Sequence, residues 1–349
     1  MAEAALTAPQ LNWLAQYLAT TSPHGCGPTL SATLVAGGRS NLTYFLTDGT
    51  HDWVLRRPPL GHVLETAHDM RREFTVLTAL GPTAVPVPRT IGYVADVSVL
   101  GSPFYVVTRV AGLTLRTAQD MRALDAEHAR RASYSFIDVF ARLHTLDPAA
   151  IGLSEFGRPA GYLQRQLVRW QRQLAGSITR PVQGFAELAG ALTAATPTTQ
   201  WTGLVHGDPR LDNALVRPEG QVAALLDWEM STLGDPLTDL GLLCLFWEGL
   251  AGLDNPIFGS PAEHPGYPPF SELATRYAAT TGRDLPDLSW YQAFAIFKFA
   301  VICEGIHARH SQGLTIGDGF DGIGAMVPAL IERGHAAIAS TPAARGHAG

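Results

Sequence analysis

The sequence LVHGDPRLDNALV, residues 204–216, is the densest cluster of polar residues within apolar surroundings in this chain. LLDWE, residues 225–229, follows at the end of an apolar run. Asp208 and Asn213 are five residues apart across a predicted tight loop, and Asp227 ends the next predicted strand. An Asp–Asn pair in a loop is by itself more typical of a turn or a helix cap. Asp227 at this interval favours a Mg²⁺ site of amide and carboxylate oxygens, with Asp208 beside it to orient a hydroxyl.

The pattern H-G-D-x-x-x-x-N, followed by an apolar strand that ends in Asp, resembles the catalytic and metal-binding loops of the aminoglycoside phosphotransferase and choline kinase superfamily, relatives of protein kinases. The resemblance is closer to the kinase-like domain of acyl-CoA dehydrogenase fusion proteins, through LVHGDxRLDN, LDWExSTLGDPxxDL and WYxAFxxFKxAxIxxGI. It covers about residues 30–335. It implies an α+β, two-lobed protein-kinase-like fold, with a small antiparallel β-sheet N-lobe carrying one helix and a larger, mostly helical C-lobe.

The resemblance also implies a role for each matching residue. Asp208 would be the catalytic base or orienting carboxylate, and Asn213 and Asp227 would hold Mg²⁺. His206 would brace the loop, although a lone histidine is more often structural. The remaining matches are acidic: Asp235 and Asp239 would support the loop from below, and Glu229 would be an outer group of the metal site.

The periodicity of the chain predicts an N-terminal helical extension over residues 1–29, an N-lobe over 30–112 and a C-lobe over 113–349. Most of the C-lobe is expected to be helical, apart from two short strands near residues 214–226. The expected N-lobe strands lie at 31–38, 41–49, 52–59, 90–94 and 104–110, with a helix at 68–80. The expected other helices lie at 9–20, 126–146, 161–174, 185–193, 237–248, 271–280, 290–310 and 322–339.

A nucleotide site in the N-lobe needs backbone N–H groups and a cation near the phosphates. The glycine-containing turn of the first hairpin supplies the backbone N–H groups if it is a phosphate loop, although a plain turn is about as good an interpretation. Arg56 in the third strand supplies the cation. Arg57 should point to the opposite face by strand alternation. Glu73 is the expected partner of Arg56, although either side chain could be ordinary surface charge. The predicted nucleotide-binding residues are Gly38, Ser40, Asn41, Arg56, Glu73, Thr108 and Val110.

Composition excludes several other classes of protein. The chain has 349 residues, a net charge of −6 and no basic stripe, which argues against nucleic acid as a partner. Its three cysteines lack CxxC spacing, so neither a disulfide framework nor a zinc site is expected. Glu248 and Lys298 interrupt the two most apolar stretches, and no secretory signal is recognisable, so we expect a cytoplasmic protein without a membrane partner.

The sequence therefore predicts a Mg²⁺-dependent enzyme that transfers the γ-phosphoryl group of ATP or GTP to a hydroxyl group of a small molecule. The expected acceptor pocket lies in the helical lobe, with Trp247, Glu248, Tyr291 and Glu304 as lining residues. Two glutamates are few for an aminoglycoside site, and the resemblance to dehydrogenase fusion proteins favours a hydroxylated acid or an acyl thioester. A catalytically inactive nucleotide-binding scaffold and a metal-dependent phosphohydrolase remain as alternatives.

Overall fold

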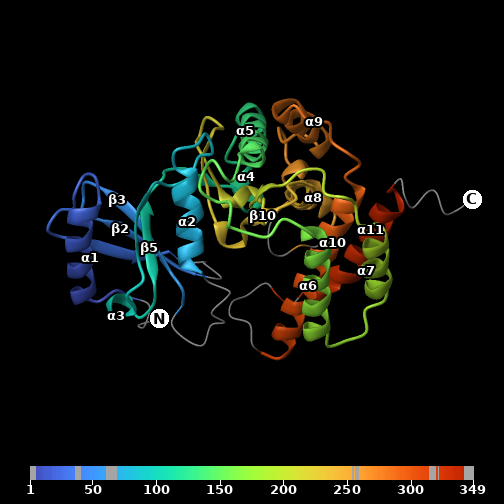
Figure 1. Ribbon diagram of the computed structural model, residues 1–349, viewed down its shortest axis with the longest axis horizontal. Helices are drawn as coiled ribbons and strands as arrows, with labels where there is room; N and C mark the ends of the chain where they lie inside the picture. The colour runs from blue at the N-terminus through green and yellow to red at the C-terminus, as the bar shows by residue number, and fades with distance from the viewer. Residues whose placement is uncertain are drawn as a thin grey trace, which may run out of the picture. The chain divides into compact units, whose positions relative to one another are not determined.

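The computed structural model describes residues 5–35, 41–59, 69–253, 255, 259–313, 320 and 322–341. The chain divides into two compact units (Figure 1). The first consists of Met1–Gly112 and Ala223–Ser231, and the second consists of Leu113–Val222 and Thr232–Gly349. Residues 223–231, which the sequence-based division assigned to the C-lobe, therefore cluster with the first unit.

An antiparallel five-stranded sheet forms the centre of the first unit, in the order β1-β2-β3-β5-β4. Asp69 begins helix α2 by accepting a hydrogen bond from the Arg72 amide, so the start of this helix is fixed by a side-chain cap. The strands are β1 (Ser31–Leu34), β2 (Leu42–Thr47), β3 (Asp52–Arg57), β4 (Thr90–Val94) and β5 (Phe104–Thr108), and the helices are α1 (Ala8–Thr21), α2 (Met70–Leu80) and α3 (Val97–Leu100).

The two faces of this sheet have different roles (Figure 1). Leu14 and Leu18 of α1 pack with Trp53, Leu55 and other apolar residues in one buried cluster. Arg56, which directly follows Leu55 on β3, faces the other side of the sheet, where it contacts α2. Strand alternation therefore decides which arginine of the Arg56–Arg57 pair reaches α2.

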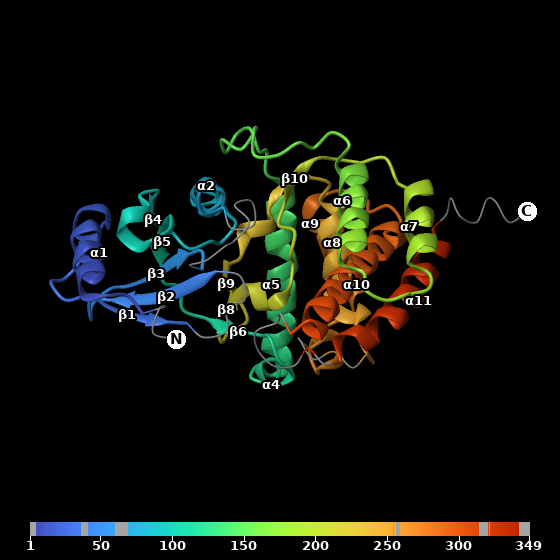
Figure 2. The same cartoon turned by 90° about the horizontal axis from the view of Figure 1, so that it is seen from below.

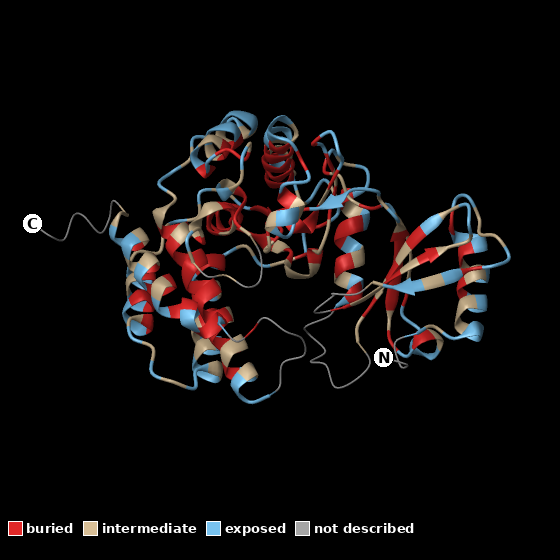
Figure 3. Cartoon of the chain, turned by 180° about the vertical axis from the view of Figure 1, so that it is seen from behind, coloured by how far each residue is buried: buried red, intermediate tan, exposed pale blue. Residues whose placement is uncertain are grey.

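The second unit is mostly helical (Figures 1 and 2). Its longest helix, α10 (Ser289–Ser311), is buried along most of its length, as the red segments of Figure 3 show, and packs against α6, α8 and α11. The other helices are α4 (Ala118–Met121), α5 (Ala126–Thr145), α6 (Tyr162–Ser177), α7 (Phe185–Ala194), α8 (Leu237–Cys244), α9 (Phe270–Thr281) and α11 (Met326–Ala339).

Short strands hold the loop that carries the polar motif. β7 (Gly203–Val205) pairs with β10 (Thr232–Gly234), and β6 (Leu113–Thr114) pairs with β8 (Ala214–Val216). One 3-10 turn, Leu211–Asn213, connects the loop to β8. The remaining short elements are β9 (Val222–Leu225), a π-helical turn at Leu245–Gly249 and 3-10 turns at Trp228–Met230, Pro261–Glu263 and Ile323–Ala325.

Most expected elements occur within a few residues of their predicted bounds. The helix expected over 237–248 ends at Cys244, because the chain continues there as a π-helical turn. The short elements α3, α4, β6, β7 and β10 had no sequence-based prediction. Within the described part of the chain, no helix combines the length and the apolar character that a membrane crossing requires.

Candidate active site

In the first unit, one arginine connects two carboxylates. Arg56 Nη1 lies 2.5 Å from Glu73 Oε1, and Arg56 Nη2 lies 3.3 Å from Asp227 Oδ1. The Glu73 side chain is 1% exposed, whereas that of Asp227 is 31% exposed. The buried glutamate thus orients the guanidinium group, and the more exposed aspartate leaves part of the cluster open to a ligand.

Burial raises the pKa of the Glu73 carboxyl, and the charge of the Arg56 guanidinium offsets part of this rise. Burial by itself lowers the pKa of Arg56, but the neighbouring Tyr105 phenol and the two carboxylates raise it above its usual value. Arg56 therefore stays charged. Asp227 has φ 64°, and it is the one non-glycine residue with a positive φ in the described ranges. Strained backbone of this kind is concentrated at functional sites, so the conformation of Asp227 supports a functional role for this residue.

The other predicted nucleotide-binding residues have varied settings. Gly38 and Ser40 lie outside the described residues. Asn41 is buried, and its Nδ2 donates to Glu229 Oε2 at 3.3 Å. Thr108 ends β5, where its Oγ1 accepts a hydrogen bond from the Arg89 amide. Val110 follows β5 without regular secondary structure.

In the second unit, Asp208 lies in the loop after β7, and its carboxylate accepts hydrogen bonds from two side chains. Asn213 Nδ2 donates to Asp208 Oδ2 at 2.8 Å and to the Asp208 carbonyl oxygen at 2.9 Å. Arg210 Nε donates to both carboxylate oxygens at 3.0 and 3.1 Å. These contacts hold the carboxylate in one orientation at the end of the loop, where a quarter of the side chain (25%) is exposed.

Buried groups support this loop from below. Asp239 accepts hydrogen bonds from the amides of His206 and Gly207 at 2.7 and 2.9 Å, and it contacts His144 Nε2 at 3.1 Å. Burial by itself raises the pKa of Asp239, but these partners outweigh that effect and lower it. Lys298 Nζ donates to the Gly207 carbonyl oxygen at 3.0 Å. The only lysine of the chain thus holds the residue that precedes Asp208.

Asp235, four residues before Asp239, is fully buried and accepts hydrogen bonds from the Leu237 amide and the Tyr291 hydroxyl. Burial raises the pKa of this carboxyl. Its partners fix the start of α8, the helix that carries Asp239.

Asn213 belongs to the second unit and Asp227 to the first. Since Asn213 Nδ2 is bonded to Asp208, its Oδ1 is left as an acceptor, and Asp227 Oδ2 has no hydrogen-bond partner among the described residues. Hard oxygens of this kind fit Mg²⁺, which needs few protein ligands. Within the described part of the chain, no group of three or more His, Cys, Asp or Glu side chains is placed to hold a metal ion.

One of the four expected acceptor residues, Trp247, lines a pocket in the second unit. Glu248 Oε2 instead accepts from the Phe270 amide, and the Tyr291 hydroxyl donates to Asp235. Glu304 is fully buried, and Arg180 donates to both of its carboxylate oxygens. The structure therefore does not bring these four residues together.

Three charged residues to which the sequence analysis assigned no role also line the pocket, namely Arg116, Arg210 and Asp212. Asp212 Oδ2 lies 3.2 Å from Arg116 Nε and 3.3 Å from Arg210 Nη1. Burial raises the pKa of the Asp212 carboxyl, and the charge of Arg210 offsets part of this rise. Arg210 and Asp212 are part of the quoted motif, so attention to its charges could have found them, whereas Arg116 is distant in sequence and gives no local signal.

A family model described as the phosphotransferase enzyme family matches residues 31–273. The chain belongs to this family. Acyl-CoA dehydrogenase family member 11 of Gallus gallus is 36% identical over 312 residues, which are 87% of this chain and 40% of the relative. The Homo sapiens protein of that name is 36% identical over 292 residues, which are 82% and 37%. The chain thus spans about two fifths of the length of these curated relatives.

Solved structures show the same fold. A Ralstonia eutropha protein, provisionally described as an aminoglycoside phosphotransferase, has a TM-score of 0.79 and 32% identity over 93% of this chain and 97% of its own. The GDP and kanamycin complex of the enzyme APH(2″)-IIIa has a TM-score of 0.59 and 17% identity over 93% and 98%. An APH(4)-Ia mutant with AMP-PNP and hygromycin B has a TM-score of 0.58 and 15% identity over 96% and 99%.

These comparisons confirm the predicted α+β, kinase-like fold and the predicted family. The chain is a phosphotransferase family member that resembles aminoglycoside and macrolide kinases in fold. Two of these related structures contain a nucleotide, GDP in one and AMP-PNP in the other.

Proposed function

We propose that this protein is a Mg²⁺-dependent kinase that transfers the γ-phosphoryl group of ATP, or of GTP, to a hydroxyl group of a small molecule. The observation that carries the proposal is the Asp208 carboxylate, fixed by Asn213 Nδ2 and Arg210 Nε at the end of the loop. A carboxylate that is held in this way can orient the hydroxyl group of an acceptor and accept its proton. Family membership supports the same reaction class.

In this reaction the acceptor oxygen forms a bond to the γ-phosphorus, while the bond from that phosphorus to the bridging oxygen breaks and the nucleoside diphosphate leaves. The hydroxyl proton passes to the Asp208 carboxylate. Arg56, held by Glu73, neutralises phosphate charge, and the loop positions the acceptor. Asn213 and Asp227 are the proposed ligands of Mg²⁺, which would neutralise further phosphate charge when bound.

The names of the relatives support one class of acceptor. The curated relatives are named as acyl-CoA dehydrogenases, and this chain corresponds to about two fifths of their length. We infer an acceptor from acyl chemistry, a hydroxylated acid or its acyl thioester, in place of an aminoglycoside. Acceptor-dependent release of ADP is the direct measurement of this activity.

The first experiment is calorimetric titration of ATP and GTP, with and without Mg²⁺, into the wild type and the Asp227→Ala variant. Mg²⁺-dependent binding that is lost in Asp227→Ala supports the proposal. Asp138→Ala is the matched control, because Asp138 also pairs with an arginine, Arg276, but lies on α5. Binding that is independent of Mg²⁺, or equal in all three proteins, contradicts the proposed metal ligand. Binding without any transfer would favour the inactive scaffold.

A further inference from the structure

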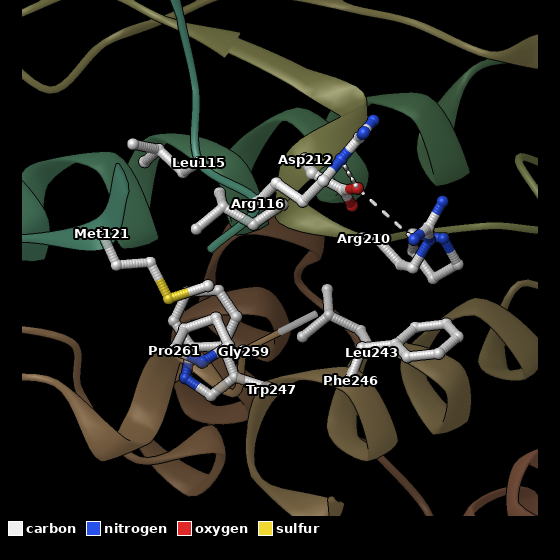
Figure 4. Close-up of a pocket in the computed structure, with 12 residues that line it drawn as sticks. Leu115, Arg116, Met121, Arg210, Asp212, Leu243, Phe246, Trp247, Gly259 and Pro261 are labelled. Carbon is white, nitrogen blue, oxygen red and sulfur yellow. Dashed lines mark hydrogen bonds and ion pairs between the residues drawn. The ribbon is translucent and has the colours of Figure 1, made fainter. Parts of the chain in front are cut away.

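A pocket in the second unit lies directly beside the catalytic loop, and it has two kinds of wall (Figure 4). Met121, Leu243 and Trp247 form its apolar floor and are each 3% exposed or less, and Trp247 comes from the π-helical turn that follows α8. Arg116 and Arg210 supply the charged edge. The part of the pocket that a ligand can reach is therefore its charged edge, where Arg116 is 52% exposed.

The charged edge is arranged around one carboxylate. Figure 4 shows Asp212 between the side chains of Arg116 and Arg210, joined to them by dashed lines. Arg210 also bonds the Asp208 carboxylate through Nε, and its guanidinium group lies 5.9 Å from the centre of the Phe246 ring. Arg210 is thus fixed by several contacts at the same time, and it separates the catalytic carboxylate from Asp212.

Arg116 differs from Arg210 because it keeps donors to spare. Only its Nε is engaged with Asp212, at 3.2 Å, and the side chain is 52% exposed. Across the described ranges, no side chain or carbonyl oxygen bonds its two terminal nitrogens. The Gly259 amide donates to the Arg116 carbonyl oxygen, which ties the backbone of this arginine to the pocket wall. Arg116 therefore offers a half-exposed guanidinium fork on an anchored backbone.

Guanidinium forks bind carboxylate and phosphate groups through two parallel hydrogen bonds. The Asp212 carboxylate already occupies one side of the Arg116 fork, and it keeps the group charged and oriented while the outer side stays available. Both carboxylates at this edge, Asp208 and Asp212, have arginine partners. A polycationic acceptor would meet the outward Arg116 guanidinium here, and like charges repel each other. Among the described residues that line the pocket, the one carboxylate, Asp212, is already paired with arginine.

We propose that the Arg116 edge of this pocket binds an anionic group of the acceptor, a carboxylate or a phosphate. This inference rests on the proposed kinase activity and specifies its acceptor. Because Arg210 links Asp208 to Asp212, the acceptor hydroxyl and its anionic group are expected a short chain apart. The pocket thereby selects against cationic acceptors.

The test measures transfer of the γ-phosphoryl group from ATP to matched pairs of acceptors. Each pair consists of a straight-chain hydroxy acid and the diol in which a hydroxymethyl group replaces the carboxylate, and kanamycin serves as the cationic acceptor. The proteins are the wild type, Arg116→Gln and Arg116→Lys. We expect the acids to have KM values about 10- to 100-fold below those of the diols, as for one charge-assisted hydrogen-bonded contact.

Arg116→Gln is expected to raise KM for the acids by about the same factor, with the KM for ATP and the diols unchanged. Arg116→Lys should restore part of the loss, since it keeps the charge without the fork. Arg130→Gln is the control, because Arg130 is equally exposed, at 53%, and pairs with Glu272 away from the pocket. It should leave every KM value unchanged.

Three results would overturn the inference: equal KM values for acids and diols, transfer to kanamycin only, or Arg116→Gln without an effect on the acids. A rise in the KM for ATP in Arg116→Gln would also overturn it, because the bound anion would then be the nucleotide phosphate. Calorimetric binding of Mg²⁺–ATP separates this failure from failure of the proposed function. If the nucleotide binds and the diols or kanamycin are phosphorylated but the acids are not, this inference fails and the kinase activity stands. Without nucleotide binding, or without transfer to any acceptor, both fail.

Discussion

Two arginine–carboxylate sites of the second unit have the same chemical groups and different surroundings. Glu304 is fully buried, and both of its oxygens accept hydrogen bonds from Arg180, which also donates to the Gly324 carbonyl oxygen. Asp212 is nearly as buried, at 5% exposed, but its partner Arg116 is half exposed and has terminal nitrogens left for a ligand. The first site connects α10 to neighbouring segments, and the second borders a pocket.

The difference shows that the exposure of the donor, and not the burial of the carboxylate, separates a structural ion pair from a binding site. A buried carboxylate needs a partner in either case, because an unpaired one is costly. Water solvates the spare donors of an accessible arginine, so we take them to indicate a ligand only where the arginine borders a pocket, as Arg116 does. The predictions below test this distinction, and they start with the largest expected effect.

Asp208→Asn should reduce kcat about 1000-fold, because general-base catalysis contributes roughly 10² to 10⁴ to the rate. Stability should change little, since the side chain is partly exposed and asparagine keeps its shape. The measurement is acceptor-dependent release of ADP together with calorimetric binding of Mg²⁺–ATP, which should be retained. Asp138→Asn, which removes a carboxylate paired with Arg276, should leave kcat unchanged. Equal turnover in Asp208→Asn and the wild type would remove Asp208 from the mechanism.

Arg180→Met should lower the free energy of unfolding by about 3 kcal/mol, because it leaves the Glu304 carboxylate buried without its partner. Arg116→Met, at the half-exposed site, should cost less than about 1 kcal/mol. Urea unfolding followed by circular dichroism measures both. The KM for the acceptor should show the opposite pattern: Arg116→Met should raise it, and Arg180→Met should leave it unchanged. If both variants lose the same stability, exposure does not distinguish the two sites.

The same distinction explains how far the sequence predicted the molecule. Strand patterns with period 2 and helical patterns with period 3.6 are local, so β4 was predicted at its observed bounds, Thr90–Val94. The two-residue strand Leu113–Thr114 exists through its partner β8, and no local pattern marks it. The π-helical turn after Cys244 likewise reads as ordinary helix in the sequence.

For the candidate site, the spacing of the motif brought attention to Asp208, whose carboxylate the structure orients through two side chains. The partner of Arg56 was also predictable, since Glu73 follows on the next helix. Glu304 was different: its position in the helical lobe suggested that it lines the acceptor pocket, but it pairs with Arg180, which is 124 residues away in the chain. Long-range pairing decides such roles, and a single sequence does not reveal it.

Two buried aspartates of α8 and its start should give opposite effects of pH on stability. The pKa of Asp239 is lowered by its hydrogen bonds and by nearby histidines against the effect of burial, so its contribution is present above the unfolded pKa and is lost as the pH falls. The pKa of Asp235 is raised by burial, so its contribution is present in acid and is lost as the pH rises.

The measurement is the free energy of unfolding at pH 6 and near the unfolded pKa of about 4 in the wild type, Asp239→Asn and Asp235→Asn. On acidification, Asp239→Asn should lose less stability than the wild type, and Asp235→Asn should lose more. Other carboxylates titrate equally in all three proteins, so the differences isolate these two groups. The same response in both variants would show that burial alone controls carboxylates beneath the catalytic loop.

The smallest effect is expected where both partners are exposed. Arg130 and Glu272 lie 3.1 Å apart with side chains 53% and 39% exposed, so water solvates each of them well without the other. Arg130→Gln should change the free energy of unfolding by less than about 0.5 kcal/mol, because exposed pairs gain little over their hydrated state. Arg116 has the same exposure, and the difference between the two lies in Asp212, which is buried and depends on its arginine partners. If Arg130→Gln and Arg116→Met lose the same free energy of unfolding, burial of the carboxylate makes no contribution to stability at these two pairs. The spare donors of Arg116 would then be the only feature that separates a binding arginine from a surface arginine.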